Sequence, residues 1–279
     1  MSVLVTGAGG FLGRYVADRL GDAGERVVGH DRALDLSSLA TTITEHDVRG
    51  IVHAAGVADG DLSVGMPATT VTTNAIGTLH LLEAARLARF RGRVVLVSSM
   101  GVYGDGEAPA LSPSTPLAAT SAFGDLLGQV YAARYGLDVV SLRLSDVYGP
   151  GRRLPRVLED IVEAAAAGRP VRVDVSAGRP ERLLHAEDAA RAVIAALNAP
   201  SPAARVYDIA GEPVLPDQVA AIVRDRTPGA AVETGAVRPP ASDDVRVTPA
   251  DRELGYRPRW GLARGIDDFY EWRAAQEAC

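Results

Sequence analysis

Short runs of β-branched residues alternate with amphipathic stretches through the first half of the chain. The strand-like runs cover residues 3–5, 26–29, 51–53, 94–97 and 138–143. The stretches with helical spacing cover residues 12–23, 78–89 and 122–134. Strands that alternate with helices in repeated βαβ units predict an α/β fold, a Rossmann-type doubly wound parallel sheet covered by helices on both faces.

The pattern loosens beyond Gly149 and Pro150, where proline and glycine interrupt the chain at short intervals. This change predicts a main domain over residues 1–150, joined by later elements from about 180–212. Residues 151–180 and 213–279 are then expected to form a small C-terminal lobe that binds the substrate.

A glycine turn follows the first strand-like run and opens the first helix. Gly7 permits the tight turn, Gly10 lets the backbone approach a pyrophosphate, and Gly13 lets the helix pack closely on its strand. Phe11 and Leu12 lie inside the motif, where the helix N-terminus supplies partial positive charge. The order of strand, glycine turn and helix predicts a dinucleotide site, and the G-x-x-G-x-x-G spacing indicates the short-chain dehydrogenase form of the turn.

Acidic residues near the second strand bear on the choice of dinucleotide. Asp31 lies 18 residues after Gly13, close to the offset at which an acid accepts hydrogen bonds from ribose hydroxyls. It would repel a 2'-phosphate, so we expect NAD rather than NADP, although Arg32 beside it softens that preference. Asp35 and Leu36 fit either a short acidic motif that contacts adenine at the end of an abbreviated third strand, or the cap of the next helix.

Composition narrows the class of protein. A formal net charge of -6 gives no excess of cations to neutralise a nucleic-acid backbone. The single cysteine, Cys279, allows neither a disulfide framework nor clustered thiolate ligands for a metal. No apolar run reaches the length of a membrane span, and no leader pattern precedes the first strand, so we expect a cytoplasmic protein. The sequence contains no lysine.

Six further motifs follow the glycine turn. They are His53-Ala54-Ala55-Gly56, Asn74-Ala75-Ile76-Gly77-Thr78, Ser98-Ser99-Met100-Gly101-Val102-Tyr103-Gly104, Arg143-Leu144-Ser145-Asp146-Val147-Tyr148-Gly149-Pro150, Arg182-Leu183-Leu184-His185-Ala186-Glu187-Asp188 and Glu253-Leu254-Gly255-Tyr256-Arg257-Pro258. Together they make the chain resemble, almost end to end, the extended short-chain dehydrogenase/reductase family. This family is also called the NAD-dependent epimerase/dehydratase family, and its members mostly act on nucleotide sugars.

The resemblance implies roles for individual residues. Ser99 is implied to be the active-site hydroxyl that hydrogen-bonds a substrate carbonyl or hydroxyl, with a strand-end cap as the alternative. Arg182 resembles the arginine that clamps a substrate diphosphate, with a surface salt bridge as the alternative, and Asp146 stands where the family usually has asparagine. The residues that we expect at the cofactor are Gly7, Gly10, Phe11, Leu12, Gly13, Asp31, Arg32, Asp35, Leu36, Ala54, Ala55, Gly56, Asn74 and Ser98.

The catalytic pair of the family, Tyr-x-x-x-Lys, is missing. An ungapped alignment puts Leu117 at the tyrosine position and Ser121 at the lysine position, with Asp125 where the family often has glutamate. A gapped alternative would use Phe123 and Leu127, and it also supplies neither a phenol nor an amine. Sugar 4,6-dehydration is also disfavoured, because that branch has an acidic pair directly after the active-site hydroxyl, where this chain has Met-Gly.

Tyr103 is then the first choice for a substitute acid, with a structural loop tyrosine as the alternative. Three functions are compatible with these residues: an atypical NAD-dependent enzyme acting on a nucleotide sugar or specialised metabolite, a non-redox cyclase, isomerase or lyase, and a dinucleotide-binding regulator. The resemblance also implies a homodimer through the helices at residues 78–89 and 118–134.

Overall fold

The computed structural model describes residues 1–32, 34–104, 110–151, 169–173, 181–226, 232–234 and 250–277. The chain divides into two compact units. The first comprises Met1–Ser145, Ala189–Ile209 and Val245–Arg257, and the second comprises Asp146–Asp188, Ala210–Asp244 and Pro258–Cys279.

A six-stranded sheet forms the centre of the first unit, in the order β2-β1-β3-β4-β5-β9. Its strands are β1 (Ser2–Thr6), β2 (Arg26–His30), β3 (Val48–His53), β4 (Arg93–Ser99), β5 (Asp138–Leu144) and β9 (Val206–Ile209). All five pairings are parallel. β1 is buried along its whole length, as expected for a strand covered on both faces.

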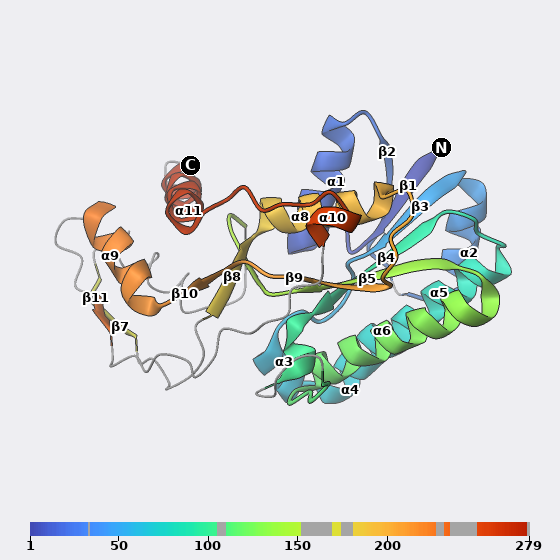
Figure 1. The fold of residues 1–279 in the computed structure, drawn as a ribbon, viewed down its shortest axis with the longest axis horizontal. Coiled ribbons are helices and arrows are strands. Elements are labelled where there is room, and N and C mark those ends of the chain that lie inside the picture. The colour runs from blue at the N-terminus through green and yellow to red at the C-terminus, as the bar shows by residue number, and fades with distance from the viewer. Residues whose placement is uncertain are drawn as a thin grey trace. The chain divides into compact units, whose positions relative to one another are not determined.

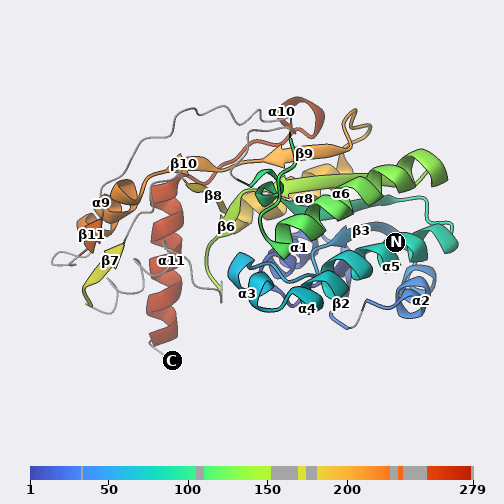
Figure 2. The same cartoon turned by 90° about the horizontal axis from the view of Figure 1, so that it is seen from below.

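Helices cover both faces of this sheet, which confirms the predicted Rossmann-type fold. Figure 1 shows α2, α5 and α6 on one face, and α1 and α8 on the other. From the underside, Figure 2 shows α5 and α6 lying side by side. The helical segments of this unit are α1 (Phe11–Asp22), α2 (Leu36–Glu45), α3 (Gly60–Gly65), α4 (Pro67–Thr70), the π-helix η1 (Val71–Ile76), α5 (Gly77–Leu87), the 3-10 turn η2 (Met100–Tyr103), α6 (Pro116–Tyr135), α10 (Ala250–Glu253) and most of α8 (Ala186–Asn198).

The order of the strands fixes where a ligand would bind. β1 and β3 are adjacent, but the chain continues from β1 to β2 on one side and from β3 to β4 on the other. The connections that leave β1 and β3 therefore run in opposite directions. In open α/β sheets, ligands bind outside the carboxyl ends of the strands at such a switch point. The switch point here lies at Thr6 and His53, the last residues of β1 and β3.

Local sequence signals explain the bounds of α6, the longest helix described. Thr115 is its N-cap, and the hydroxyl of Thr115 accepts a hydrogen bond from the backbone N–H of Ala118 at 3.2 Å. Pro116 occupies the first turn, where its missing N–H costs nothing. Gly136 ends the helix in the left-handed region with φ +69°.

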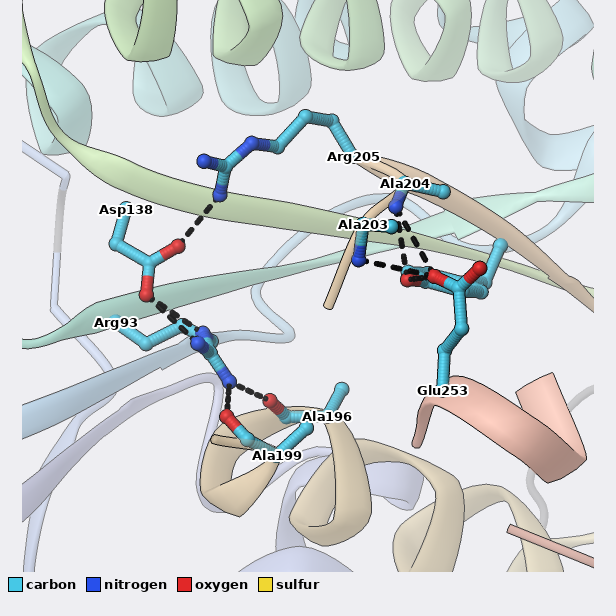
Figure 3. A network of polar contacts seen from close by, with 9 residues as sticks. Arg93, Asp138, Ala196, Ala199, Ala203, Ala204, Arg205 and Glu253 are labelled. Carbon is cyan, nitrogen blue, oxygen red and sulfur yellow. Dashed lines mark hydrogen bonds and ion pairs between the residues drawn. The ribbon is translucent and has the colours of Figure 1, made fainter. Parts of the chain in front are cut away.

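The amino end of the sheet is tied to later segments of the chain by arginine and glutamate side chains (Figure 3). Arg93 forms an ion pair with Asp138 at 2.8 Å and donates to the carbonyls of Ala196 in α8 and of Ala199 directly after this helix. The carboxylate of Glu253 in α10 accepts hydrogen bonds from the backbone of Ala203 and Ala204. These contacts place residues 250–257 in the first unit, although we expected them in the C-terminal lobe.

In the part of the second unit that the structure describes, there are two small sheets and the helices α9 and α11. Its elements are β6 (Asp146–Tyr148), β7 (Val171–Val173), β8 (Glu181–His185), β10 (Glu212–Val214), α9 (Pro216–Arg226), β11 (Val232–Thr234) and α11 (Leu262–Glu277). Its core comprises Tyr148, Leu183, Val214, Val219, Ala220, Ile266 and Phe269. β8 belongs to this unit rather than to the main domain as we expected, because it pairs with β6 and β10. Within the described ranges, no helix is both long and apolar enough to cross a bilayer.

Candidate active site

The turn after β1 has space only for glycine at two positions. Gly7 has φ +72°, and a Cβ there would lie 2.7 Å from the backbone N and Cα of Ala55. A Cβ on Gly13 would lie 1.9 Å from the carbonyl oxygen of Gly7. The backbone N–H of Gly10 donates to that same oxygen at 2.9 Å. The glycines therefore let the turn, the start of α1 and the loop after β3 pack in direct backbone contact.

The start of α1 fits the diphosphate of a dinucleotide. Gly10 is its N-cap and has no side chain, and the first turn holds no acidic residue. The helix therefore supplies no anion of its own to the positive end of its dipole, which is the end that binds phosphate groups. Phe11 and Leu12, in this first turn, are half-buried.

The carboxylate of Asp31 lies against the glycine turn. Asp31 follows β2 directly, and its Oδ1 accepts a hydrogen bond from the backbone N–H of Gly9 at 3.0 Å. A Cβ on Gly29 would lie 3.1 Å from the Cβ of Ala8, so β2 packs closely on the turn. This arrangement fits a carboxylate that binds the ribose hydroxyls beside the diphosphate. Arg32, the next residue, is exposed.

Asp35 is the N-cap of α2, one of the two roles that its sequence left open. Its carboxylate accepts hydrogen bonds from the backbone N–H of Ser38 at 2.9 Å and from the hydroxyl of Ser37 at 2.8 Å. The backbone bond and then the hydroxyl bond lower the pKa of Asp35. Leu36 packs against the core under α2, so the pair has a complete structural role at the start of this helix.

The loop after β3 is held to β1 by hydrogen bonds. The backbone N–H of Ala54 donates to the carbonyl of Thr6 at 3.1 Å, and that of Ala55 donates to the Thr6 hydroxyl at 3.4 Å. The loop therefore runs beside the glycine turn, at the carboxyl ends of β1 and β3, where the switch point lies.

Asn74 in η1 fixes the far end of this loop. Its side-chain oxygen accepts from the backbone N–H of Val57 at 2.8 Å, and its side-chain N–H donates to the carbonyl of Val57 at 3.0 Å. A Cβ on Gly56 would lie 2.9 Å from the Asn74 oxygen. Asn74 thus positions the loop through paired backbone contacts.

Ser99 ends β4 and caps η2. Its hydroxyl oxygen accepts a hydrogen bond from the backbone N–H of Gly101 at 3.0 Å, so the hydroxyl proton is not used in this bond. Ser99 is half-buried, whereas Ser98 before it is buried. The capping role that we held as an alternative for Ser99 is therefore present, and it is compatible with donation to a substrate oxygen.

Tyr103 is part of a buried network of charged groups. Its hydroxyl donates to Asp208 in β9 at 2.8 Å and accepts from Arg143 in β5 at 2.7 Å. Arg143 also donates to Asp125 in α6 at 2.7 Å. All four residues are less than 10% exposed. Burial raises the pKa of Tyr103, and both hydrogen bonds of its hydroxyl lead into the protein, which favours the structural alternative over proton transfer.

Sequence reasoning missed two members of this network. Arg143 and Asp208 each interrupt a buried apolar strand, in DVVSLRL and VYDI. A charged residue in a strand that is buried on both faces requires a partner, and this is the signal that would have paired them. Burial raises the pKa of both Asp125 and Asp208 because it disfavours their charged forms, and the nearby Arg143 guanidinium opposes this shift.

The start of α6 carries the residues that the ungapped alignment expects at the catalytic-pair positions. Leu117 and Ser121 are one helical turn apart and both are half-buried, so they share a face of the helix. Phe123, the aromatic residue of the gapped alternative, is 39% exposed.

Both candidate substrate residues lie in the second unit. Asp146 begins β6, is exposed, and pairs in register with Leu183 on β8. Arg182 directly precedes Leu183 and is half-buried. The two candidates are therefore brought onto neighbouring strands of one sheet.

His185, which we had noted only as part of a motif, is the centre of a buried cluster in this unit. Its ring stacks on Trp260 with the centroids 4.1 Å apart and meets Tyr148 edge-on at 5.2 Å. Its Nε2 lies 3.3 Å from a carboxylate oxygen of Asp268, and burial lowers the pKa of His185 to about 4. Trp260 is 75 residues away in sequence, so no local pattern pairs it with His185.

A family model agrees with this geometry over most of the chain. The model of the NAD dependent epimerase/dehydratase family matches residues 3–210. The chain belongs to this family. NAD is therefore the cofactor, and the cofactor prediction is confirmed.

Individual members of the epimerase/dehydratase family align with nearly the whole chain. A dTDP-glucose 4,6-dehydratase of Streptomyces niveus is 32% identical over 313 residues, covering 98% of this chain and 92% of its own length. A UDP-glucose 4-epimerase of Mycolicibacterium smegmatis is 30% identical over 316 residues, with 98% of both chains covered. The structure of MoeE5 in complex with UDP-glucuronic acid and NAD superposes with a TM-score of 0.86 at 26% identity, covering 99% of this chain and all of that one.

Proposed function

We propose that this epimerase/dehydratase-family chain binds NAD and acts on a nucleotide sugar or a related specialised metabolite without the usual tyrosine and lysine. The observation that carries the proposal is the contrast within one unit. The glycine turn, the uncapped start of α1 and Asp31 are in place, whereas α6 begins with Leu117 and Ser121. The nucleotide-sugar activities named for its relatives support the substrate class.

The residues divide into groups with different tasks in this proposal. The glycine turn holds the NAD diphosphate, and Asp31 holds the adenosine ribose. Ser99 donates its unused hydroxyl proton to an oxygen of the substrate. In the second unit, Arg182 binds a substrate diphosphate, and Asp146 selects against substrates that need a neutral donor at that position.

The missing pair determines how fast such an enzyme would work. NAD supplies the hydride acceptor, but oxidation of an alcohol also requires a base for the hydroxyl proton. A positioned general acid or base contributes typically about 10²- to 10⁴-fold. Neither Leu117 nor Ser121 ionises near neutral pH, so the proton must pass to the substrate's own groups or to water, and turnover is expected to be slow.

The first experiment asks whether the purified protein retains its cofactor. Freshly purified protein is denatured, and the released dinucleotide is identified and quantified by mass spectrometry. We expect NAD or NADH in near-stoichiometric amount. A protein that is empty and also fails to bind added NAD would contradict the proposal.

The second experiment restores the pair. Leu117→Tyr with Ser121→Lys is expected to raise the rate of NAD reduction with nucleotide sugars by about 10²-fold or more. The matched control is Phe123→Tyr with Leu127→Lys, which places the same groups at the gapped positions. Equal effects of the two double variants would contradict the assignment of the α6 start as the catalytic position.

A dinucleotide-binding protein without turnover is the second candidate. It is favoured by the Tyr103 hydroxyl, whose two hydrogen bonds go to Asp208 and Arg143 inside the protein. This candidate predicts NAD and NADH affinities that differ, with no hydride transfer for any nucleotide sugar even in single-turnover experiments. Detectable NADH formation on mixing enzyme, NAD and a sugar nucleotide would exclude it.

A homodimer through α5 and α6 completes the proposal. Phe123, Leu126 and Val130 have the i, i+3, i+7 spacing of one helix face and are 39%, 54% and 49% exposed. Light scattering is expected to give twice the chain mass of 29.2 kDa. Leu126→Glu should shift the mass to that of a monomer, whereas Leu111→Glu, at an exposed leucine outside these helices, should leave it unchanged.

A further inference from the structure

Three buried polar side chains link the two strands at the switch point to the helix beneath them. They are Thr6 at the end of β1, His53 at the end of β3 and Thr78 in α5. The Thr6 hydroxyl lies 2.7 Å from Nδ1 of His53, and Nε2 of His53 lies 3.0 Å from the Thr78 hydroxyl. Each of the three residues is at most 7% exposed.

Counting protons fixes the tautomer of His53. Thr78 has one hydroxyl proton, which it donates to the carbonyl of Asn74 at 2.6 Å, so its oxygen must accept from His53. Nε2 of His53 therefore carries the proton, and Nδ1 accepts from the Thr6 hydroxyl. The Thr6 oxygen then accepts from the backbone N–H of Ala55. Every donor in this series has one acceptor, which requires a neutral imidazole.

The series continues from Asn74 to the start of α6. The side-chain amide of Asn74 holds both backbone groups of Val57 and donates to the Thr120 hydroxyl at 3.3 Å. The Thr120 hydroxyl lies 2.9 Å from the carbonyl oxygens of both Pro116 and Leu117, which share its single proton. One hydrogen-bonded path thus joins the strand before the glycine turn to the helix turn that holds Leu117.

We propose that His53, locked as the neutral Nε2-protonated tautomer, is a positioning residue for NAD binding. The mechanical link is the contact at Gly7, where a Cβ would lie 2.7 Å from the backbone of Ala55. Because the loop at residues 54–57 touches the turn this closely, a shift of the loop displaces the glycine turn. His53 and Asn74 hold the two ends of that loop in register with β1.

Nitrogen-15 spectra of the unmodified protein test the tautomer directly. The chain has five histidines, and long-range proton–nitrogen correlations distinguish the two neutral tautomers and the imidazolium form of each. The signals of His53 are assigned by their loss in His53→Phe or, if that variant does not fold, in His53→Gln. We expect the Nε2-protonated neutral form between pH 5.5 and pH 8. An Nδ1-protonated or charged ring in this range would overturn the proposal.

Binding measurements test the positioning role. His53→Phe removes both hydrogen bonds and is expected to raise the Kd for NAD by about tenfold or more. Ile51→Val is the matched control, because Ile51 is fully buried in the same strand and lies outside the path. The control should lower the Tm while leaving the Kd within about twofold. A folded His53→Phe variant that binds NAD like the control would overturn the proposal.

Thr78→Val tests the same path without altering the histidine. It removes the acceptor of the Nε2 proton and keeps the shape of the side chain, so the Kd for NAD is expected to rise about three- to tenfold. The His53 signals should also shift, because Nε2 has lost its partner. If Thr78→Val changes neither the Kd nor the His53 spectrum, the path does not position the cofactor loop.

Discussion

At the carboxyl ends of β1 and β3, backbone amides and the carboxylate of Asp31 lie around a turn shaped for a dinucleotide, whereas at the ends of β4 and β5 the polar side chains bond to one another. The cofactor region is defined by backbone contact, with a Cβ on Gly13 only 1.9 Å from an oxygen. The region beside it contains a buried hydrogen-bonded network of Tyr103, Arg143, Asp125 and Asp208.

In the function that we propose, binding and turnover therefore depend on separate parts of the same sheet. A turn whose fit to a diphosphate depends on backbone geometry can persist while side chains elsewhere change. Catalysis depends on individual side chains, and our ungapped alignment expects Leu117 and Ser121 where the family has its tyrosine and lysine. The network of Tyr103, Arg143, Asp125 and Asp208 near η2 offers no evident substitute, because these side chains are buried and bond to one another.

The largest expected effect comes from breaking the buried network. Arg143→Met removes the cation between Asp125 and Asp208 and leaves two carboxylates in the interior, which costs about 3–5 kcal/mol of stability. Urea unfolding at pH 7 measures the loss. The control, Arg205→Met, removes an ion pair whose arginine side chain is 44% exposed, and should cost less than about 1 kcal/mol. Similar losses for the two variants would show that the network does not support the fold.

The second-largest expected effect is a loss of NAD affinity in a variant of the glycine turn, with protein stability measured as a control. Gly13→Ala drives a methyl group into the Gly7 carbonyl, so the Kd for NAD is expected to rise about 100-fold or more, measured by calorimetry. Gly21→Ala lies in the same helix, and a Cβ there meets nothing within 4 Å. It should stabilise the protein by about 0.5–1 kcal/mol with unchanged NAD affinity. Retained binding in Gly13→Ala would refute the steric account of the turn.

The same division explains what the sequence could reveal. The glycine turn and Asp31 are local signals, because the residues that define the turn lie within one strand, one loop and one helix start. Strand periodicity likewise predicted the parallel sheet, whose strands are each short and apolar. These features depend on neighbours in the sequence or on a spacing that backbone geometry imposes.

The polar networks could not be predicted in this way. Tyr103 and Asp208 are 105 residues apart, and only the pairing of β5 with β9 brings Asp208 beside η2. Tyr103 therefore suggested a proton carrier from its position after β4, whereas its partners come from strands that the motif does not include. The boundary at β8 was misplaced for a similar reason, since its partner β10 follows it by more than 25 residues.

The pH dependence of stability also distinguishes the two regions, because His53 belongs to the cofactor region. Burial lowers its pKa to about 4, below its ordinary value of 6.5, so folding favours the neutral ring. The stability that this provides is present above pH 6.5 and is lost as the pH falls toward 4, by about 2 kcal/mol at pH 5. Asp125 and Asp208 act with the opposite sign, since burial raises their pKa values.

Comparing unfolding at pH 7 and pH 5 in two variants isolates the histidine. In His53→Phe, the loss of stability between these pH values should be smaller than in the unmodified protein by about 2 kcal/mol. His46→Gln, at the end of α2, keeps His53 and should show the full loss. An unchanged pH dependence in His53→Phe would mean that His53 is not held neutral by folding.

The smallest expected effect separates the two roles that the sequence left open for Asp35. If its carboxylate serves only as the N-cap of α2, Asp35→Ala costs about 1 kcal/mol of stability and leaves the Kd for NAD within about twofold. Asp35→Asn keeps an oxygen that accepts from Ser38, so it should retain most of that stability. A contact with adenine would instead weaken NAD binding in Asp35→Ala. Nicotinamide mononucleotide, which lacks the adenine ring, would then bind equally well to Asp35→Ala and to the unmodified protein. That outcome would extend the cofactor region as far as α2 and move Asp35 from support of the fold to binding.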